Sequence, residues 1–359
     1  MPAPDLVSLE IHDIAFGGKG VARHEGKVYF VPFTIPGERI KARVLKQKKN
    51  FAEAELVSVE EASPHRVKAP CPYFARCGGC SYQHIDYAQQ VEIKSGQVEQ
   101  TLKRVGKLAS VPMQSPVAAP KPFGYRNRIR VHSAGGVTGF FAADARAIVD
   151  VQECLLAVPE VNRSLRRLRE TPVRDGDYSL RAPGGGGPYF EQTNPEVTKA
   201  LVDTVLSQVR GSGTLVDAYC GAGLFAKALA GRFEKVIGIE ANFAAIESAR
   251  RNAGPNEAYI AGDVSESLGE VLSYHPAERT TVLLDPPSEG FAARVGELLL
   301  GAAPAEILYV SCNPATLARD LQMLGSSYEV LSVTPLDMFP QTAEIEVVVH
   351  LGLRESSGR

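Results

Sequence analysis

The sequence predicts an α/β fold with a mostly parallel sheet in its C-terminal half, preceded by a small β-barrel and a β-rich central segment. Two observations support this. From residue 214 onward, apolar runs such as TLVDAY, KVIGIE and TVLLDP alternate with helix-compatible stretches, as in parallel sheets covered by helices on both faces. In the first 60 residues, short alternating runs are broken by FGGKG, HEGK and IPGE, a pattern typical of a small barrel.

These patterns divide the chain into three expected domains. Residues 1–60 form the barrel, 61–190 the central domain and 191–359 the α/β domain. The spacing of apolar residues predicts a helix over about 86–107, which could pack on the α/β domain. The stretch VPMQSPVAAPKPFG that follows is too rich in proline to continue it.

Composition narrows the class of protein. The chain has 359 residues and a formal net charge of -2, which argues against a protein that coats nucleic acid with a uniformly basic surface. It contains no run of eighteen apolar residues and its N-terminus lacks a signal-like layout. We therefore expect a cytoplasmic monomer with no membrane contact. Arg126, Arg128 and Arg130 alternate along an expected strand, so they would share one face and could contact RNA phosphates.

A nucleotide-like ligand is expected at the end of the first strand of the α/β domain. That strand runs into DAYCGAG, in which Gly221 and Gly223 allow the backbone to approach a ligand closely. The second strand ends at Glu240, where a carboxylate can accept both ribose hydroxyls. A dinucleotide site would need a third glycine, and position 226 is Ala. This favours S-adenosylmethionine over a dinucleotide.

Two more acidic residues follow the next strands. Asp263 comes after the third strand, where it could reach an adenine edge, and Asp285 comes after the fourth, in the motif DPP. Ligands in such sheets bind beyond the carboxyl ends of the strands. The alternative is that these carboxylates only cap helices, as acidic residues at strand-to-helix turns often do.

A cysteine follows the fifth strand at a position suited to catalysis. Cys312 precedes Asn313 and Pro314, an N-cap residue followed by a first-turn proline. The positive end of a helix dipole stabilises a thiolate. A thiolate at the ligand edge of the sheet could add to carbon 6 of a uracil and make its carbon 5 electron-rich.

These regions resemble a known family. SCNPATLARDL and DMFPQTAEIEVVVHL are similar to the signature regions of the RNA uridine-5-methyltransferases, which have a Rossmann-like class I methyltransferase domain. The resemblance implies that Cys312 is the nucleophile and Glu346 the base that removes the carbon 5 proton. It also implies a cofactor site for S-adenosylmethionine formed by Gln192, Tyr219, Gly221, Gly223, Glu240, Asp263 and Asp285.

The first two domains carry further resemblances. The N-terminal 60 residues resemble a TRAM domain, an oligonucleotide-binding-type barrel. In a cytosolic chain, clustered cysteines favour a metal or cluster site over disulfides. By resemblance to one branch of the family, the ligands of a [4Fe-4S] cluster would be Cys71, Cys77, Cys80 and Cys154. Zinc remains an alternative, since four thiolates suit both.

The RNA substrate is predicted only in part. The barrel and the cysteine set resemble members of the family that act on 23S rRNA more than those that act on tRNA. Transfer to tRNA therefore stays an alternative. So does an amino-group methyltransferase that uses Asp285-Pro286-Pro287, although Ser288 cannot stack on a base as an aromatic residue would. The remaining alternative is an RNA-binding protein without catalysis.

Overall fold

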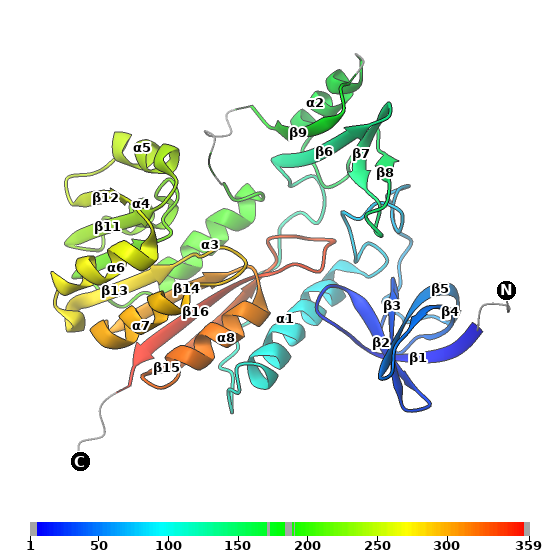
Figure 1. The fold of residues 1–359 in the computed structure, drawn as a ribbon, viewed down its shortest axis with the longest axis horizontal. Coiled ribbons are helices and arrows are strands. Elements are labelled where there is room, and N and C mark those ends of the chain that lie inside the picture. Colours follow the sequence, from blue (N-terminus) through cyan, green and yellow to red (C-terminus); the bar gives the residue numbers. More distant parts are fainter. Residues whose placement is uncertain (1–5, 171–172, 184–188, 190, 355–359) are drawn as a thin grey trace. The chain divides into compact units, whose positions relative to one another are not determined.

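The computed structural model describes residues 6–170, 173–183, 189 and 191–354 (Figure 1). The chain forms two compact units, each made of separate stretches of sequence. Unit 1 comprises Met1–Gln97, Lys121–Pro183 and Phe339–Glu344. Unit 2 comprises Val98–Pro120, Gly184–Met338 and Ile345–Arg359. Among the described residues, no helix is long and apolar enough to cross a membrane.

Unit 1 begins with the expected barrel, which is closed and has the strand order β1-β2-β3-β5-β4. Inward-facing apolar residues such as Ile11, Val31 and Ile40 form its core, because alternate residues of a strand face the same side. The strands are β1 (Leu6–Ile14), β2 (Lys19–His24), β3 (Lys27–Pro32), β4 (Arg39–Gln47) and β5 (Phe51–Glu61).

Unit 1 also contains a four-stranded antiparallel sheet of order β8-β7-β6-β9 and one helix packed on it. Helix α2 buries Val161 and Leu165 against Ile129 and Val131 of the sheet. The elements are β6 (Arg128–Ala134), β7 (Val137–Phe141), β8 (Ile148–Asp150), α2 (Pro159–Arg169) and β9 (Gly176–Arg181). Helix α1 (Tyr87–Arg104) lies within the range predicted for it.

Unit 2 contains the expected α/β sheet, with seven strands in the order β12-β11-β10-β13-β14-β16-β15. The first five are parallel, and β16 and β15 add to the edge in antiparallel fashion. The prediction of a mostly parallel sheet is therefore confirmed. The strands are β10 (Thr214–Ala218), β11 (Lys235–Glu240), β12 (Glu257–Ala261), β13 (Thr280–Leu284), β14 (Glu306–Ser311), β15 (Tyr328–Leu336) and β16 (Glu346–Leu353).

Helices cover both faces of this sheet. Three of them, α6, α7 and α8, share one large apolar core with the strands, and α3, α4 and α5 lie on the opposite face (Figure 1). Their bounds are α3 (Pro195–Gln208), α4 (Leu224–Leu229), α5 (Phe243–Arg251), α6 (Val264–Ser273), α7 (Ala293–Ala302) and α8 (Pro314–Leu324).

An early stretch of the chain completes the edge of the sheet. The backbone amides of Gln114 and Val117 donate to Val333 and Pro335 of β15, each at 2.8 Å. The bridges formed by Met113 and Val117 with β15 are parallel. Residues 98–120, expected in the central domain with the helix over 86–107 able to pack on the α/β domain, lie within unit 2. Val98 and Leu102 of α1 join its apolar core, and Gln114 and Val117 pair with its edge strand β15. Sequence patterns report local structure, and this pairing is long-range.

Candidate active site

The carboxyl ends of the parallel strands meet at one edge of the sheet. In the strand register, Ala218 lies opposite both Ile239 and Leu284, and Leu284 lies opposite Tyr309. The loops that follow β10, β11, β13 and β14 therefore start side by side. Asp263 follows β12, whose last residue, Ala261, lies opposite Glu240 at the same edge. The other residues predicted for cofactor and catalysis, except Gln192, follow or end β10, β11, β13 and β14 or begin the paired strand β16.

The glycine loop after β10 is fixed by Glu240. The Gly221 amide donates to one carboxylate oxygen of Glu240 at 3.1 Å, and the Asn242 amide donates to the other at 2.7 Å. Gly223 has a φ of 86° and precedes the first turn of α4. A Cβ there would also lie 2.9 Å from the Tyr259 hydroxyl, so position 223 requires glycine on two counts.

Three carboxylates gather at this edge. Asp217 is fully buried and accepts a 2.9 Å hydrogen bond from the Ala226 amide. Burial, followed by the nearby charges of Asp285 and Glu240, raises the pKa of Asp217 to about 8. Burial and Glu240 likewise raise the pKa of Asp285. Burial and the neighbouring negative charges both oppose ionisation of these carboxyl groups, and a positively charged ligand at this edge would favour their charged forms.

Asp263 and Tyr219 lie at the same edge. Asp263 caps α6: its Oδ1 accepts from the Ser265 hydroxyl and, at 2.7 Å, from the Ser265 amide, and these two hydrogen bonds lower the pKa of its carboxyl. Capping is thus part of its role, as the alternative interpretation held. Tyr219 has a φ of 67°, a backbone conformation that side chains seldom adopt. Such strain is commonly found at functional loops.

The strand register brings Cys312 and Glu346 to the same level. Ser311, the last residue of β14, lies opposite Val347 of β16. Because the two strands are antiparallel, the next residue of β14, Cys312, continues toward Glu346, the first residue of β16. Glu346 is buried and Cys312 is partly exposed. A thiol and a carboxyl group thus lie at the same level of two neighbouring strands, and β14 is also the neighbour of β13, which leads to Asp285.

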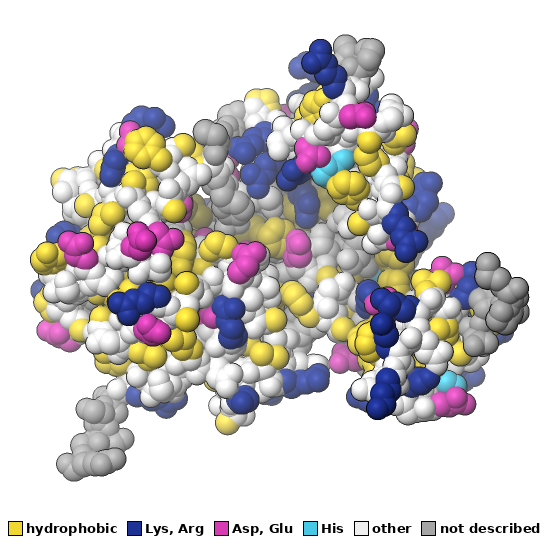
Figure 2. Space-filling model, in the orientation of Figure 1, with side chains coloured by type: hydrophobic (Ala, Val, Ile, Leu, Met, Phe, Trp, Pro, Cys, Tyr) yellow, Lys and Arg dark blue, Asp and Glu magenta, His cyan; other side chains and the backbone are white. Residues whose placement is uncertain are grey.

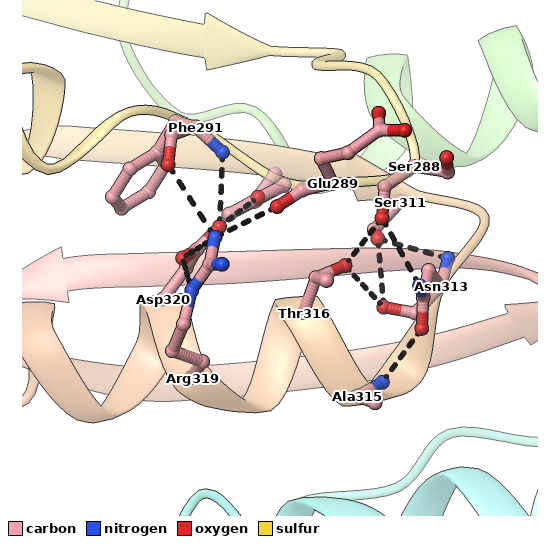
Figure 3. A network of polar contacts seen from close by, with 10 residues as sticks. Ser288, Glu289, Phe291, Ser311, Asn313, Ala315, Thr316, Arg319 and Asp320 are labelled. Atoms are coloured by element: carbon pink, nitrogen blue, oxygen red, sulfur yellow. Dashed lines mark hydrogen bonds and ion pairs between the residues drawn. The ribbon is translucent and has the colours of Figure 1, made fainter.

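The turn after Cys312 has the predicted cap. The Asn313 side chain accepts from the Ala315 amide at 3.0 Å, and Pro314 occupies the first turn of α8. Figure 3 shows that the same turn holds the loop after β13. The Asn313 side-chain amide and the Thr316 hydroxyl both donate to the Ser288 carbonyl, at 3.0 and 2.9 Å. The DPPS motif is therefore tied to the residue next to Cys312.

Sequence reasoning missed a second tie between these loops. Buried Asp320 accepts from the Phe291 amide at 3.1 Å and from the Tyr309 hydroxyl at 2.6 Å (Figure 3). Arg319 donates to the carbonyls of Glu289 and Phe291. Arg319 and Asp320 both follow Cys312 within SCNPATLARDL. The available signal was Asp320, an acidic residue on the side of the helix that also carries Leu317 and Leu321.

Gln192 stands apart from the strand tips in sequence. It is partly buried and lies two residues before Asn194, the N-cap of α3. The buried Asn194 side chain donates to the Met338 carbonyl at 3.4 Å. This tie holds the stretch that carries Gln192 to the chain just after β15.

In unit 1, the four cysteines predicted as cluster ligands line one cavity of about 200 Å³. The Gly79 amide donates to the Cys77 sulfur at 3.4 Å and the Gln83 side-chain amide donates to the Cys80 sulfur at 3.1 Å. Burial raises the pKa of Cys77 and of Cys154, and that of Cys80 to about 12. No group of three or more His, Cys, Asp or Glu side chains in the described ranges is arranged to hold a metal ion.

The three predicted RNA-binding arginines do not act as one row. Arg128 and Arg130 lie in β6, and the exposed Arg130 pairs with Asp177. Arg126 precedes the strand and lines the cysteine cavity, where its Nε is buried without a hydrogen-bond partner. Figure 2 shows Lys and Arg side chains gathered over α2, β6 and β9. A basic surface is present in this sheet, but Arg126 faces the cavity.

Known proteins are similar to this chain over nearly its whole length. A family model described as tRNA (uracil-5-)-methyltransferase matches residues 170–261 and 270–354, and a TRAM domain model matches residues 7–57. An uncharacterized RNA methyltransferase of Halalkalibacterium halodurans is 31% identical, over 98% of this chain and 97% of that protein. One of Bdellovibrio bacteriovorus is 34% identical, over 96% and 94%.

A solved structure matches the whole architecture. The tRNA (uracil-54, C5)-methyltransferase of Pyrococcus abyssi, in complex with S-adenosyl-L-homocysteine, superposes with a TM-score of 0.72 at 26% identity. The match covers 96% of this chain and 100% of that one.

Proposed function

This chain belongs to the family of RNA (uracil-5-)-methyltransferases that use S-adenosylmethionine, and we propose that it methylates carbon 5 of one uridine in 23S rRNA through a covalent adduct with Cys312. The observation that carries the proposal is the register that brings Cys312 level with Glu346 at the ligand edge of the sheet. One group can add to a uracil ring there while the other takes a proton from it.

The chemistry follows from these two side chains. The Cys312 thiolate adds to carbon 6 of uracil, and the electron pair moves to make carbon 5 an enolate-type nucleophile. S-adenosylmethionine, when bound, supplies the electrophilic methyl group. Glu346 then accepts the carbon 5 proton, the double bond between carbons 5 and 6 forms again, and the thiolate leaves. A uridine in folded RNA must be turned out of its stack to reach this edge.

The cofactor would be held by the loops after β10, β11, β12 and β13. Glu240 would accept the ribose hydroxyls and Asp263 would reach the adenine, while Gly221 and Gly223 let the backbone approach. The carboxylate cluster attracts the positively charged sulfonium and amino groups. The remaining residues proposed for this site are Gln192, Tyr219 and Asp285.

We expect Glu240→Ala to weaken S-adenosylmethionine binding by about 1.5 to 3 kcal/mol, the usual cost of losing a charged hydrogen-bond partner. Isothermal calorimetry on the folded variant measures this. Glu234→Ala is the matched control. Glu234 is exposed, pairs with Arg279, and precedes the first residue of β11, whereas Glu240 is the last residue of that strand. Equal affinity in both variants would contradict the assignment.

For the cysteine cavity, we propose a [4Fe-4S] cluster held by Cys71, Cys77, Cys80 and Cys154. Each ligand of a cubane binds a different iron, which suits thiols spread around one cavity. Burial opposes a thiolate at Cys77, Cys80 and Cys154, so a bound cation would keep these sulfurs deprotonated. Backbone and side-chain N–H groups that point at the sulfurs suit such a cluster.

Protein purified without oxygen should then contain about four irons per chain and a matching amount of sulfide. Cys80→Ala should lose most of this iron, whereas Cys312→Ala, which removes a thiol from unit 2, should keep it. Stoichiometric zinc, with neither iron nor sulfide, would mean that the four cysteines form a zinc site and not a cluster site.

For RNA binding, we propose that Arg128 and Arg130 contact phosphates, together with the barrel. A methyl-transfer assay with labelled cofactor and unmodified 23S rRNA or tRNA tests the function. Label in 5-methyluridine of 23S rRNA is the expected result. Label only in tRNA would mean that the substrate is tRNA and not 23S rRNA. Label on an amino group would mean that the enzyme is an amino-group methyltransferase. No label with either RNA would favour an RNA-binding protein without catalysis.

A further inference from the structure

The four-stranded sheet of unit 1 has one face that α2 does not cover. Helix α2 packs on the face that carries Ile129 and Val131 of β6. Because alternate residues of a strand face opposite sides, Arg128, Arg130 and His132 lie on the other face. The side chain of Arg130 is 65% exposed, so this second face is open to solvent at that position.

Two rings are stacked on this open face. The ring centres of His132 in β6 and Phe141 in the neighbouring strand β7 are 4.0 Å apart, and the ring planes differ by 31°. Phe141 is nevertheless 46% exposed, whereas His132 is partly buried. A single exposed phenylalanine is ordinary on a protein surface. An exposed ring that already lies on a second ring has the shape of a platform for a further planar group.

Asp177 of β9 holds both His132 and Arg130 in place. The Nδ1–H group of His132 donates to one carboxylate oxygen of Asp177 at 2.6 Å, and the Arg130 guanidinium donates to the other. These hydrogen bonds, that from Arg130 above all, lower the pKa of the Asp177 carboxyl, so it is ionised at neutral pH. The imidazole plane is therefore fixed in advance, which reduces the entropy lost when a ligand binds.

The charge around these rings is mainly positive. The charged residues of β6 and β9 are Arg128, Arg130, Arg181 and Asp177. Arg128 and Arg181 lie directly opposite each other in the antiparallel register, so their guanidinium groups start from the same face. Figure 2 shows basic, histidine and hydrophobic side chains together over this sheet. Three positive charges against one negative charge attract a polyanion.

We propose that this face binds an unpaired nucleotide of the RNA substrate, with Phe141 and His132 as a stacking platform for its base. The base lies on the Phe141 ring, and Arg128 and Arg130 contact the phosphates on either side. Every base has a π-face, so such a site tolerates sequence. It distinguishes unpaired from paired RNA, because a base inside a duplex is already stacked on its neighbours. The inference rests on the proposed function and adds to it that the RNA must offer a single-stranded segment to unit 1.

Replacing Phe141 tests the platform. Phe141→Leu keeps an apolar side chain but removes the ring, and Phe141→Trp enlarges the ring. We expect Phe141→Leu to weaken the binding of single-stranded oligoadenylate to the full chain by about 5- to 150-fold, the range that one stacked base contributes. Phe141→Trp should bind at least as tightly as the wild type. Fluorescence anisotropy with labelled oligoadenylate measures both, and duplex RNA should bind equally to the wild type and to both variants.

The matched control is Val137→Ala, which should bind oligoadenylate like the wild type, since Val137 is also an exposed apolar residue of β7. Arg130→Gln separates charge from stacking. It should lower the slope of log affinity against log salt by about one, whereas Phe141→Leu should lower affinity by the same factor at every salt concentration. With unmodified 23S rRNA as substrate, Phe141→Leu should raise the KM for RNA and leave kcat and cofactor affinity unchanged.

The readouts separate the possible results. Equal affinity of Phe141→Leu and the wild type for oligoadenylate overturns the platform, as does an equal loss of affinity for duplex RNA. If RNA affinity is unchanged and the wild type, but not Phe141→Leu, sediments as a dimer, the face is an interface between copies of the chain and the proposal is wrong. If the wild type methylates no RNA while oligoadenylate binding still depends on Phe141, the platform stands and the proposed function fails.

Discussion

Cys312→Ala should abolish methyl transfer to uridine, by on the order of 10⁴-fold or more, the scale seen when a covalent nucleophile is removed. The variant lacks the sulfur that adds to carbon 6, so carbon 5 stays a poor nucleophile. No covalent complex between protein and RNA should form either. Both results are read from one denaturing gel with labelled cofactor and a methyl-transfer time course.

The control for this variant is binding. Cys312 lies before the N-cap of α8, and Ser311, Asn313 and Thr316 make hydrogen bonds that hold that turn. Replacing the thiol should therefore leave folding and noncovalent binding of RNA and cofactor intact. Methylation of uridine at a near-normal rate would mean that Cys312 is not the nucleophile, and methylation of an amino group or ribose would become the better interpretation.

Glu346→Gln should have the opposite effect on the same adduct. The amide fills the space of the carboxylate, so addition of Cys312 and methyl transfer can proceed, but no base removes the carbon 5 proton. Turnover should fall by about 10²- to 10⁴-fold, the usual contribution of a general base. A methylated complex that resists denaturant should accumulate, with label from the cofactor in the band that contains protein and RNA.

Glu344→Gln is the matched control for this variant. Glu344 is exposed, two residues before Glu346, and should turn over without a trapped complex. A trapped complex in Glu344→Gln, with normal turnover in Glu346→Gln, would move the base to Glu344. Normal turnover in both would direct attention to Asp285, whose raised pKa suits a proton acceptor.

The sequence predicted features that are set within short stretches of chain. The barrel, the parallel sheet and the cap formed by Asn313 and Pro314 follow from local patterns, and the structure contains each of them. The grouping of Asp217 with Glu240 and Asp285 could be expected only in outline. Parallel strands place their ends together, but the burial that raises these pKa values depends on packing.

Other features depend on residues far apart in sequence. Gln90 and Gln341 are 251 positions apart, and no local pattern predicts that they bond. Arg126 was expected beside Arg128 and Arg130, because residues two apart share a face of a strand. The strand begins only at Arg128, so the alternation did not extend to Arg126, which turns toward the cysteine cavity.

The pairing of residues 111–117 with β15 has a consequence for the order in which the protein can fold during synthesis. The amides of Gln114 and Val117 find their partners only in β15, which the ribosome makes more than 200 residues later. Until then, the amides of Gln114 and Val117 have no backbone partner, and β15 itself joins the sheet only through β16, which is made after it. Domains that finish early can fold on the nascent chain. The barrel is such a domain, whereas the catalytic unit closes only after its last strands have left the ribosome.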